Sequence, residues 1–160
     1  MSTPAFQPHD HGACIAHGVA LAEAECRAKG LRLTQVRRRV LEILLSKHRA
    51  MGAYDVLDVL REEGLGSQPP VAYRALEFLV SNGFAHRVER LNAFVACTHA
   101  DHNHAPAFLI CRGCKTVVEL DSTQPRQAIA AAAQTVGFTV ERAAIEAEGL
   151  CPPCAKAATA

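Results

Sequence analysis

Three kinds of signal are missing from this sequence, and each absence argues against a class of protein. The 160 residues contain no apolar run near the roughly 18 residues that cross a bilayer, so we expect no membrane partner. The segment from Met1 to His11 has neither a basic start nor an apolar stretch before a cleavage site, so we expect a cytoplasmic protein. There is no Ser-His-Asp order, Gly-rich phosphate loop or pair of buried carboxylates, so we expect no enzyme.

The composition fits a folded protein that needs extra stabilisation. Hydrophobic residues make up 49% of the chain and charged residues 21%, as in globular proteins. A length of 160 residues suits one ordinary domain or two small ones, and small domains often need a metal or a partner subunit. The seven cysteines would be reduced in the cytoplasm, so pairs of them indicate metal or redox sites rather than disulfides.

The net charge of +1 hides a basic segment. Between Arg27 and Arg49 the only acidic residue is Glu42, and the basic side chains there could contact nucleic-acid phosphates. A solvated helix face is the alternative explanation of this charge. The basic residues are Arg27, Lys29, Arg32, Arg37, Arg38, Arg39, Lys47 and Arg49.

Helical periodicity and turn residues divide the first half of the chain. Residues 1–14 have no periodicity and predict a flexible tail. In the segments that follow, apolar residues recur every three or four positions, and glycines stand where helices should end. We expect a helix from Ile15 to Lys29, a second capped by Thr34, a third from Gly52 to Gly64, a fourth that follows Pro69-Pro70 and ends at Asn82, and strands over 85–89 and 93–96.

Compact helices followed by a β-hairpin predict a winged helix-turn-helix domain over residues 15–97. Recognition helices of this class present their first turn to the major groove, and here that turn carries Tyr73 and Arg74. The alternative is a small helical domain with a hairpin and no DNA function. The predicted DNA-binding residues are Tyr54, Tyr73, Arg74, Arg37, Arg38 and Arg39, with Arg74 reading a base.

The composition changes after Cys97. Residues 98–106 form a polar, His-rich hinge, and residues 107–160 predict a small α+β dimerisation domain. We expect strands over Ala107–Ile110, Thr116–Leu120 and Phe138–Arg142 and a helix over Pro125–Val136. A unit of this size has too small a core to be stable alone, so dimerisation and a bound metal would each stabilise it. The fold class is therefore α+β, with two small domains.

Two Cys-x2-Cys pairs form the strongest chemical signal. Cys111 and Cys114 are followed, after 36 intervening residues, by Cys151 and Cys154. Four thiolates in two knuckles predict a tetrahedral structural zinc. A single pair could be a thioredoxin-like redox motif, but neither pair lies between a strand and a helix of a βαβ unit, and the duplication favours one four-ligand site.

A second, more diffuse group of metal-binding side chains surrounds the hinge. Its members are His86, Cys97, His99, Asp101, His102, His104 and Glu119. A mixture of nitrogen, sulfur and oxygen donors suits zinc, and a thiolate disfavours the harder Mn(II) and Fe(II). A solvated hinge is an equally good explanation from the residues alone. His9, His11 and Cys14 could form a metal-binding tail, but a mobile end explains them better.

These motifs, in this order, resemble the ferric uptake regulator superfamily and specifically its zinc uptake regulator branch. The resemblance covers nearly the whole chain from about residue 15. It is carried by Arg32-Leu33-Thr34, Ala53-Tyr54-Asp55-Val56-Leu57, Pro69-Pro70-Val71-Ala72-Tyr73-Arg74-Ala75-Leu76, Gly83-Phe84-Ala85-His86, Cys111-Arg112-Gly113-Cys114 and Gly149-Leu150-Cys151-Pro152-Pro153-Cys154.

The resemblance implies a homodimer that binds double-stranded operator DNA and holds two zinc ions per subunit. Carried over by position, the regulatory zinc ligands are His86, Cys97, His104 and Glu119. Some members of the family have an additional metal site, which His99, Asp101 and His102 could form in this chain. The implied function is a zinc-dependent transcriptional repressor of zinc uptake genes that binds a palindromic operator.

Two departures and two alternatives accompany this resemblance. Thr34-Gln35-Val36-Arg37 lacks the usual helix-initiating proline, and Val71-Ala72-Tyr73-Arg74 lacks a threonine that could cap the recognition helix or contact a phosphate. Operator preference is therefore expected to differ from the family norm. The alternatives are an iron- or peroxide-responsive member of the superfamily, and a zinc-buffering or redox protein without DNA function.

Overall fold

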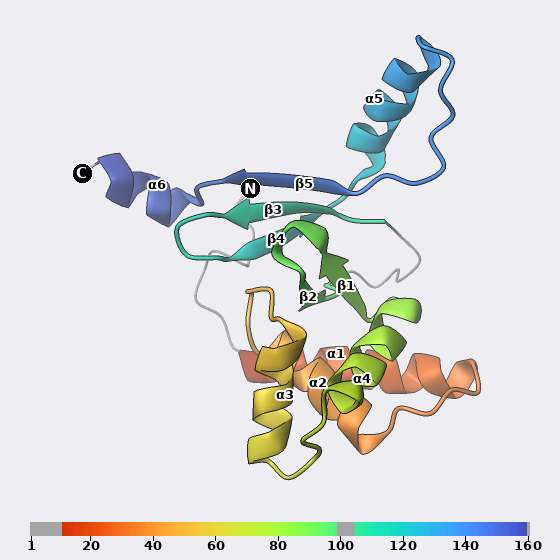
Figure 1. Ribbon diagram of the computed structural model, residues 1–160, viewed down its shortest axis with the longest axis vertical. Coiled ribbons are helices and arrows are strands. Elements are labelled where there is room, and N and C mark those ends of the chain that lie inside the picture. Colours follow the sequence, from red (N-terminus) through yellow and green to blue (C-terminus); the bar gives the residue numbers. More distant parts are fainter. Residues whose placement is uncertain (1–10, 99–104, 160) are drawn as a thin grey trace.

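The computed structural model describes residues 11–98 and 105–159, which form a helical region and a sheet region joined by a β-hairpin (Figure 1). The helical region contains α1 (His11–Ala28), α2 (Gln35–Leu45), α3 (Ala53–Glu62) and α4 (Pro69–Ser81). The hairpin of β1 (Ala85–Val88) and β2 (Ala93–Ala96) follows directly. This is the winged helix-turn-helix arrangement that the sequence predicted. None of the described helices is long and apolar enough to cross a membrane.

The helical region has an extensive core because the predicted apolar faces converge. Thr34 caps α2, and its side chain accepts a hydrogen bond from the backbone N–H of Arg37 (3.4 Å). The two prolines begin α4 at positions where no intrahelical N–H bond is lost. The most completely buried side chains here are Val40, Leu44, Val56, Leu57, Leu60, Leu76, Leu79 and Phe84.

The first helix begins earlier than the sequence predicted. It starts at His11 rather than Ile15, so His11 and Cys14 lie in regular helix and not in a tail over residues 1–14. Gly30 follows the helix with a positive φ of 64°, as the expected stop signal requires. The hairpin turn is a short 3-10 helix, η2 (Glu89–Leu91), closed by Asn92 in the left-handed conformation.

The second region is a three-stranded sheet with a helix projecting from each end (Figure 1). The strands β3 (Ala107–Cys111) and β4 (Val117–Leu120) are antiparallel, and β5 (Ile145–Gly149) runs parallel to β3 on its other edge. The helices are α5 (Thr123–Gln134) and α6 (Pro152–Thr159). The α+β class is confirmed, with α6 as an element that the sequence analysis did not anticipate.

One predicted strand is wrong. Residues 138–142 have no regular structure, and the third strand is β5, further along the chain. The pattern of Phe138 to Arg142 alternates as a strand does, but Phe138 is 64% exposed and has no sheet beneath it. Cys151 lies two residues after β5, so the register that brings this cysteine beside Cys111 also selects Ile145–Gly149 as the strand.

The hairpin and the sheet share a second apolar cluster, which joins the two regions. Val88 and Val95 of the hairpin pack with Phe108, Ile110 and Val117 of the sheet. At one end of this joint the N–H of Val117 donates to the carbonyl of His48 (2.9 Å). The two regions are therefore in direct contact through packed side chains and through the backbone.

At the other end of the joint, Glu146 of β5 receives the hairpin turn. Its carboxylate accepts hydrogen bonds from the backbone N–H groups of Glu89 (2.6 Å) and Arg90 (2.8 Å). The guanidinium of Arg90 also forms an ion pair with Glu148 (3.3 Å). Both acidic residues lie on β5, which has no buried side chain. Hydrogen bonds to a carboxylate and an ion pair therefore attach this strand to the hairpin.

Candidate metal centres and DNA-binding face

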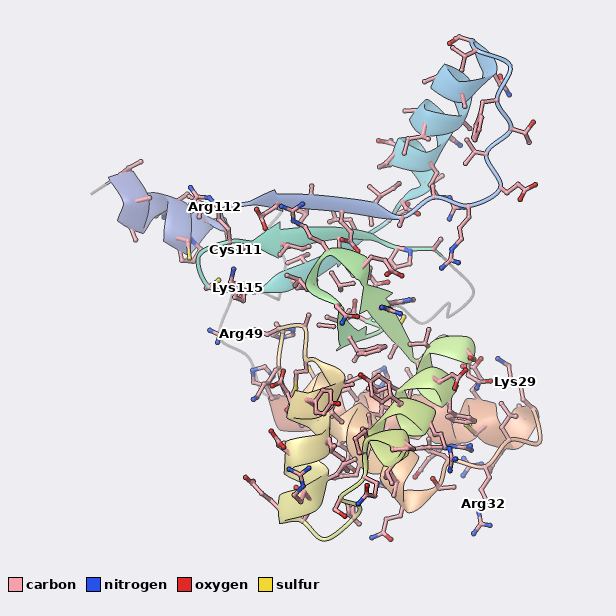
Figure 2. All side chains as sticks on the ribbon, in the orientation of Figure 1. Lys29, Arg32, Arg49, Cys111, Arg112 and Lys115 are labelled. Atoms are coloured by element: carbon pink, nitrogen blue, oxygen red, sulfur yellow. The ribbon has the colours of Figure 1, made fainter. Side chains whose placement is uncertain are left out.

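The four cysteines of the two Cys-x2-Cys pairs meet at one end of the sheet. Their sulfur atoms all lie within 4.8 Å of one another, and the sulfurs of Cys114 and Cys151 are 3.6 Å apart. Cys111 ends β3, Cys114 lies in the following turn, Cys151 follows β5 and Cys154 belongs to α6. Figure 2 shows Cys111 at this edge, with Arg112 and Lys115 around it. The parallel pairing of β3 and β5 thus brings together residues 40 positions apart.

Local backbone geometry shapes this pocket for an ion. The turn after Cys111 is closed by Lys115, whose N–H donates to the carbonyl of Cys111 (2.9 Å) and whose φ is +63°. A Cβ on Gly113 would lie 3.0 Å from the sulfur of Cys154. Position 113 therefore needs glycine because the fourth sulfur approaches the turn closely.

The cysteines differ in their ease of ionisation. Backbone N–H groups of Cys114 and Cys151 lower the pKa of Cys111 to about 6, whereas hydrogen bonds with the sulfurs of Cys151 and Cys111 raise the pKa of Cys154 to about 12. Four thiolates cannot be charged together at this separation without a cation between them. A tetrahedral Zn²⁺ satisfies that requirement, so the donor set fits structural zinc.

A second cluster lies at the joint between the two regions. His86 is on β1, Cys97 follows β2 and Glu119 is on β4, and their ligand atoms all lie within 4.8 Å of one another. The Nε2 atom of His86 is 3.5 Å from the carboxylate of Glu119, whose side chain is 4% exposed. The backbone N–H and the hydroxyl of Thr98 donate to the same carboxylate at 3.1 and 3.2 Å.

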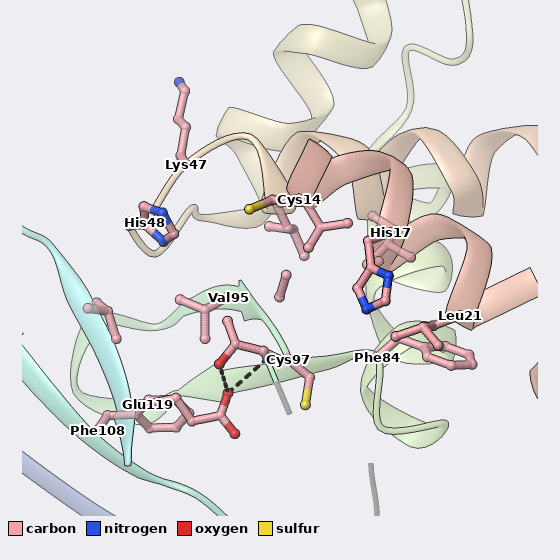
Figure 3. Close-up of a pocket in the computed structure, with 17 residues that line it drawn as sticks. Cys14, His17, Leu21, Lys47, His48, Phe84, Val95, Cys97, Phe108 and Glu119 are labelled. Carbon is pink, nitrogen blue, oxygen red and sulfur yellow. Dashed lines mark hydrogen bonds between the residues drawn. The ribbon is translucent and has the colours of Figure 1, made fainter. Parts of the chain in front are cut away.

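This second cluster has the chemistry of a metal site that links domains. It offers one nitrogen, one sulfur and one carboxylate oxygen, a mixture that suits zinc and includes a thiolate that hard cations disfavour. Cys97 and Glu119 open onto a cavity of about 270 Å³ between α1, the hairpin and the sheet (Figure 3). The structure brings together three of the four predicted regulatory ligands. The fourth, His104, lies outside the described residues, as do His9, His99, Asp101 and His102.

The predicted DNA contacts divide into two groups, of which one is exposed. Tyr54 at the start of α3 is 62% exposed, Tyr73 in the first turn of α4 is 48% exposed, and Arg74 is also exposed. The two tyrosines line one groove of about 460 Å³, together with Arg87 of the hairpin. The first turns of α3 and α4 and the hairpin therefore present polar side chains to a common face.

The second group, Arg37 to Arg39, makes contacts within the protein. The Arg37 guanidinium lies 3.7 Å from the ring centre of Phe78. Arg38 forms ion pairs with Glu23 and Glu42, and Arg39 forms one with Glu63 (2.6 Å) that lowers the pKa of the Glu63 carboxyl. These contacts link α2 to α1, α3 and α4. A role for the three arginines on DNA stays a prediction.

Several residues of these sites escaped the sequence analysis. Thr98, Gly113 and Glu146 each support a cluster through a contact that spans 20 or more residues along the chain. Thr98 adjoins Cys97 and Gly113 lies within a knuckle, so proximity to a ligand was a usable signal for both. Glu146 lies in a polar segment, and the sequence contains no local signal of its role.

Comparison with known proteins was made on this geometry. The model of the ferric uptake regulator family matches residues 28–148. The zinc uptake regulation protein of Escherichia coli (strain K12) is 39% identical over 137 residues, which cover 85% of this chain and 80% of that protein. A structure of a zinc uptake regulator complexed with zinc and DNA superposes with a TM-score of 0.84 at 36% identity, covering 91% of this chain and 98% of the other.

Crystal structures of another protein, XcZur, in its holo and apo states show which arrangement of the chain the present structure resembles. The holo form superposes with a TM-score of 0.76 at 40% identity, covering 86% of this chain and 96% of that one. The apo form gives 0.52 at 39% identity, covering 89% and 99%. Because the identities are nearly equal, the difference in TM-score reflects how the chain is arranged. The present chain has an arrangement closer to that of the holo form.

Proposed function

The chain belongs to the ferric uptake regulator family, and from this we propose that it is a zinc-dependent transcriptional repressor. It binds palindromic operator DNA as a homodimer and controls genes of zinc uptake. The observation that carries the proposal is the cluster of His86, Cys97 and Glu119 at the joint between the hairpin and the sheet. The relatives named for zinc uptake regulation, and the one complexed with zinc and DNA, support it.

The first zinc has a structural role in this proposal. Cys111, Cys114, Cys151 and Cys154 hold it and fasten the C-terminal helix and β5 to the turn after β3. The sheet buries too few apolar side chains to be stable by packing alone, and the zinc supplies the missing stability. Metal-binding free energy becomes folding free energy when the site forms only in the folded state.

The second zinc is the signal. His86, Cys97 and Glu119, with His104 as the fourth ligand, hold it across the joint. Cys97 favours a zinc sensor over an iron- or peroxide-responsive one, because sensors of harder metals are expected to use oxygen and nitrogen donors at this position. The present structure is more similar to the holo than to the apo structure of XcZur, which supports the observed arrangement of the two regions as the one that this zinc stabilises.

The switch follows from where those ligands lie. His86 lies on the hairpin of the DNA-binding domain, Cys97 directly follows that hairpin, and Glu119 lies on a strand of the dimerisation domain. Zinc binds the arrangement in which they meet more tightly than others and so shifts the population toward it. In a dimer this fixes the separation of two recognition helices near the spacing of two half-sites. Operator DNA must in turn tighten zinc binding by the same factor.

DNA recognition is assigned to the exposed first turn of α4. Arg74 reads a purine in the major groove, where an Arg–guanine pair is worth about 1–3 kcal/mol of discrimination. Tyr73 and Tyr54 contact sugar and phosphate beside it, which positions the helix without reading sequence. The N-cap of α4 is Gln68, and Val71 lies within the first turn of the helix, so the threonine missing at position 71 would act through a phosphate contact and not as the N-cap.

A homodimer is supported by the apolar surface of the second region. Val136 and Phe138 are 79% and 64% exposed, Ile129 is exposed on α5, and α5 contributes no buried residue to the single chain. Exposed apolar patches of this kind mark interaction surfaces. A second copy of the chain would cover them.

The proposal is tested by pairing metal analysis with a DNA shift assay on wild type and Cys97→Ser. Cys97→Ser should stay dimeric and keep about one zinc per subunit in the four-cysteine site, yet lose zinc-dependent DNA binding. Arg74→Ala should keep both zinc ions and lose about tenfold or more of its preference for operator over random DNA. A Cys97→Ser protein that binds its operator normally, with operator DNA leaving zinc affinity unchanged, would contradict the proposal. Activation by Fe(II) or Mn(II) instead of zinc would favour the iron-type alternative.

A further inference from the structure

The first turns of α1 carry two potential metal ligands that the proposed function does not use. His11 and Cys14 are three residues apart in the helix, so their side chains lie on the same face, one turn apart. Both are exposed. In a flexible tail their separation would vary, but in a helix it is fixed.

A third ligand reaches the same place from another part of the chain. His48, in the segment between α2 and α3, contacts His11, with ring centres 5.2 Å apart and ring planes tilted by 43°. With Zn–N bonds of about 2.0–2.1 Å, two imidazoles on one tetrahedral ion have ring centres about 5 Å apart. The observed separation therefore suits two imidazoles that share an ion.

Cys14 is the third donor. The ligand atoms of His11, Cys14 and His48 do not all lie within 4.8 Å of one another, as those of the two clusters above do, so these side chains would have to close around an ion. Cys14 and His48 both line the cavity, and Figure 3 shows the sulfur of Cys14 pointing toward the side on which His48 lies. His17, one turn further along α1, points toward the Cys97 end instead. The cavity is thus lined by Cys14 and His48 on one side and by Cys97 and Glu119 of the proposed sensory cluster on another.

We propose that His11, Cys14 and His48 form an accessory zinc site. Two imidazole nitrogens and one thiolate match the donors that zinc prefers, and three protein ligands leave one position for water. Because His11 and Cys14 are exposed and the coordination is open, this site fills after the four-cysteine and sensory sites. It would respond to zinc concentrations above those that saturate the sensory cluster.

The position of His48 gives the site a consequence for the joint. Its backbone carbonyl accepts the hydrogen bond from Val117 of β4, and the adjacent Arg49 pairs with Thr116 in an isolated β-bridge. An ion on the imidazole of His48 would therefore fasten α1 to the segment already bonded to the dimerisation sheet. Zinc at this site adds a second tie between the regions and stabilises the same arrangement as the sensory zinc.

The test is a cysteine-alkylation footprint of the full-length protein during titration with Zn²⁺. The thiolate that binds a metal is not available as a nucleophile, so zinc should slow iodoacetamide labelling of Cys14 about tenfold or more, as measured on its peptide by mass spectrometry. Protection of Cys14 should appear at higher zinc concentration than protection of Cys97 and Cys111. Those two cysteines serve as internal references in the same sample.

Three variants make the footprint specific. His11→Gln and His48→Gln should each abolish protection of Cys14 while Cys97 and Cys111 stay protected, and His17→Gln should behave as wild type. His11 is exposed, so its variant tests the site even if His48→Gln perturbs the joint. Cys14 labelling that does not depend on zinc, or protection that persists in both His11→Gln and His48→Gln, would overturn the proposal. Cys97→Ser should lose zinc-dependent DNA binding yet keep Cys14 protection, so failure of the proposed function and failure of this site are distinguishable.

Discussion

The helical region and the sheet region bury apolar side chains to different extents. Leu57, Leu60 and Leu79 are essentially inaccessible within residues 11–98, where the four helices enclose a core of their own. In residues 105–159 the buried apolar side chains, apart from Cys151, lie on β3 and β4 and are partly shared with the hairpin, and neither α5 nor α6 contributes one. The first region has a core of its own, whereas the second buries little by itself and, in the proposed function, is stabilised by zinc, by the hairpin and by a partner subunit.

The largest expected effect comes from removing the structural zinc. Cys151→Ser, or strong chelation, should unfold or monomerise residues 105–159, because structural zinc is worth on the order of 10 kcal/mol in small domains. Amide hydrogen exchange should show loss of protection in β3 and β5 while α2 and α4 keep theirs. A Cys151→Ser protein as dimeric and as heat-stable as wild type would contradict this division of the molecule.

The converse change tests the helical core. Leu60 is fully buried, so Leu60→Ala should cost about 2–5 kcal/mol of unfolding free energy through lost burial and a cavity. Chemical denaturation followed by helix signal measures it. Zinc in the four-cysteine site and the dimer should survive. Leu65→Ala, at a less buried position, serves as the milder control.

A smaller effect is expected at the proposed dimer surface. Phe138→Ser should leave the folded subunit nearly unchanged but weaken the dimer by about 1–3 kcal/mol, roughly fivefold to 150-fold in dissociation constant, because the partner subunit would cover this side chain in the proposed dimer. Sedimentation equilibrium gives the constant. Tyr54→Ser, at an equally exposed aromatic in the helical region, is the matched control and should not affect dimerisation. Equal dimer affinity in wild type and Phe138→Ser would place the interface elsewhere.

The smallest effect is expected at the charged end of the joint. Glu146→Gln keeps an acceptor for the turn N–H groups but loses the charge, so we expect a cost of about 0.5–1 kcal/mol for these exposed bonds. The readout is the zinc affinity of the sensory cluster, which should fall by up to about fivefold because its ligands span the same joint. Glu141→Gln, an exposed carboxylate in the loop before β5, is the control. Equal effects of the two changes would show that net charge, not the contact, is responsible.

Much of the helical region and the four-cysteine site could be predicted because local rules decide them. Thr34 caps α2 through a bond to a residue three positions away, and the Cys-x2-Cys spacing places the two sulfurs of each pair in one turn. The duplication of that pair indicated a four-ligand site, although the pairing of β3 with β5 is what brings the two pairs together. The exposed first turn of α4 followed in the same way from apolar periodicity. Such features involve few residues of chain, so little besides the sequence determines them.

Other features depended on contacts between residues that are far apart in the sequence. Which segment becomes the third strand was set by pairing with β3, and a local alternation at 138–142 predicted the wrong one. His86 meets Glu119 only because the hairpin packs on the sheet in one register, and a shift by one residue would turn Glu119 to the other face. His11 meets His48, and Arg39 meets Glu63, for the same reason. The sequence by itself determined the ligand types, the Cys-x2-Cys pairs and most of the helices, although not α6. Tertiary structure alone decided which distant side chains share a site, because that choice depends on packing summed over the whole chain.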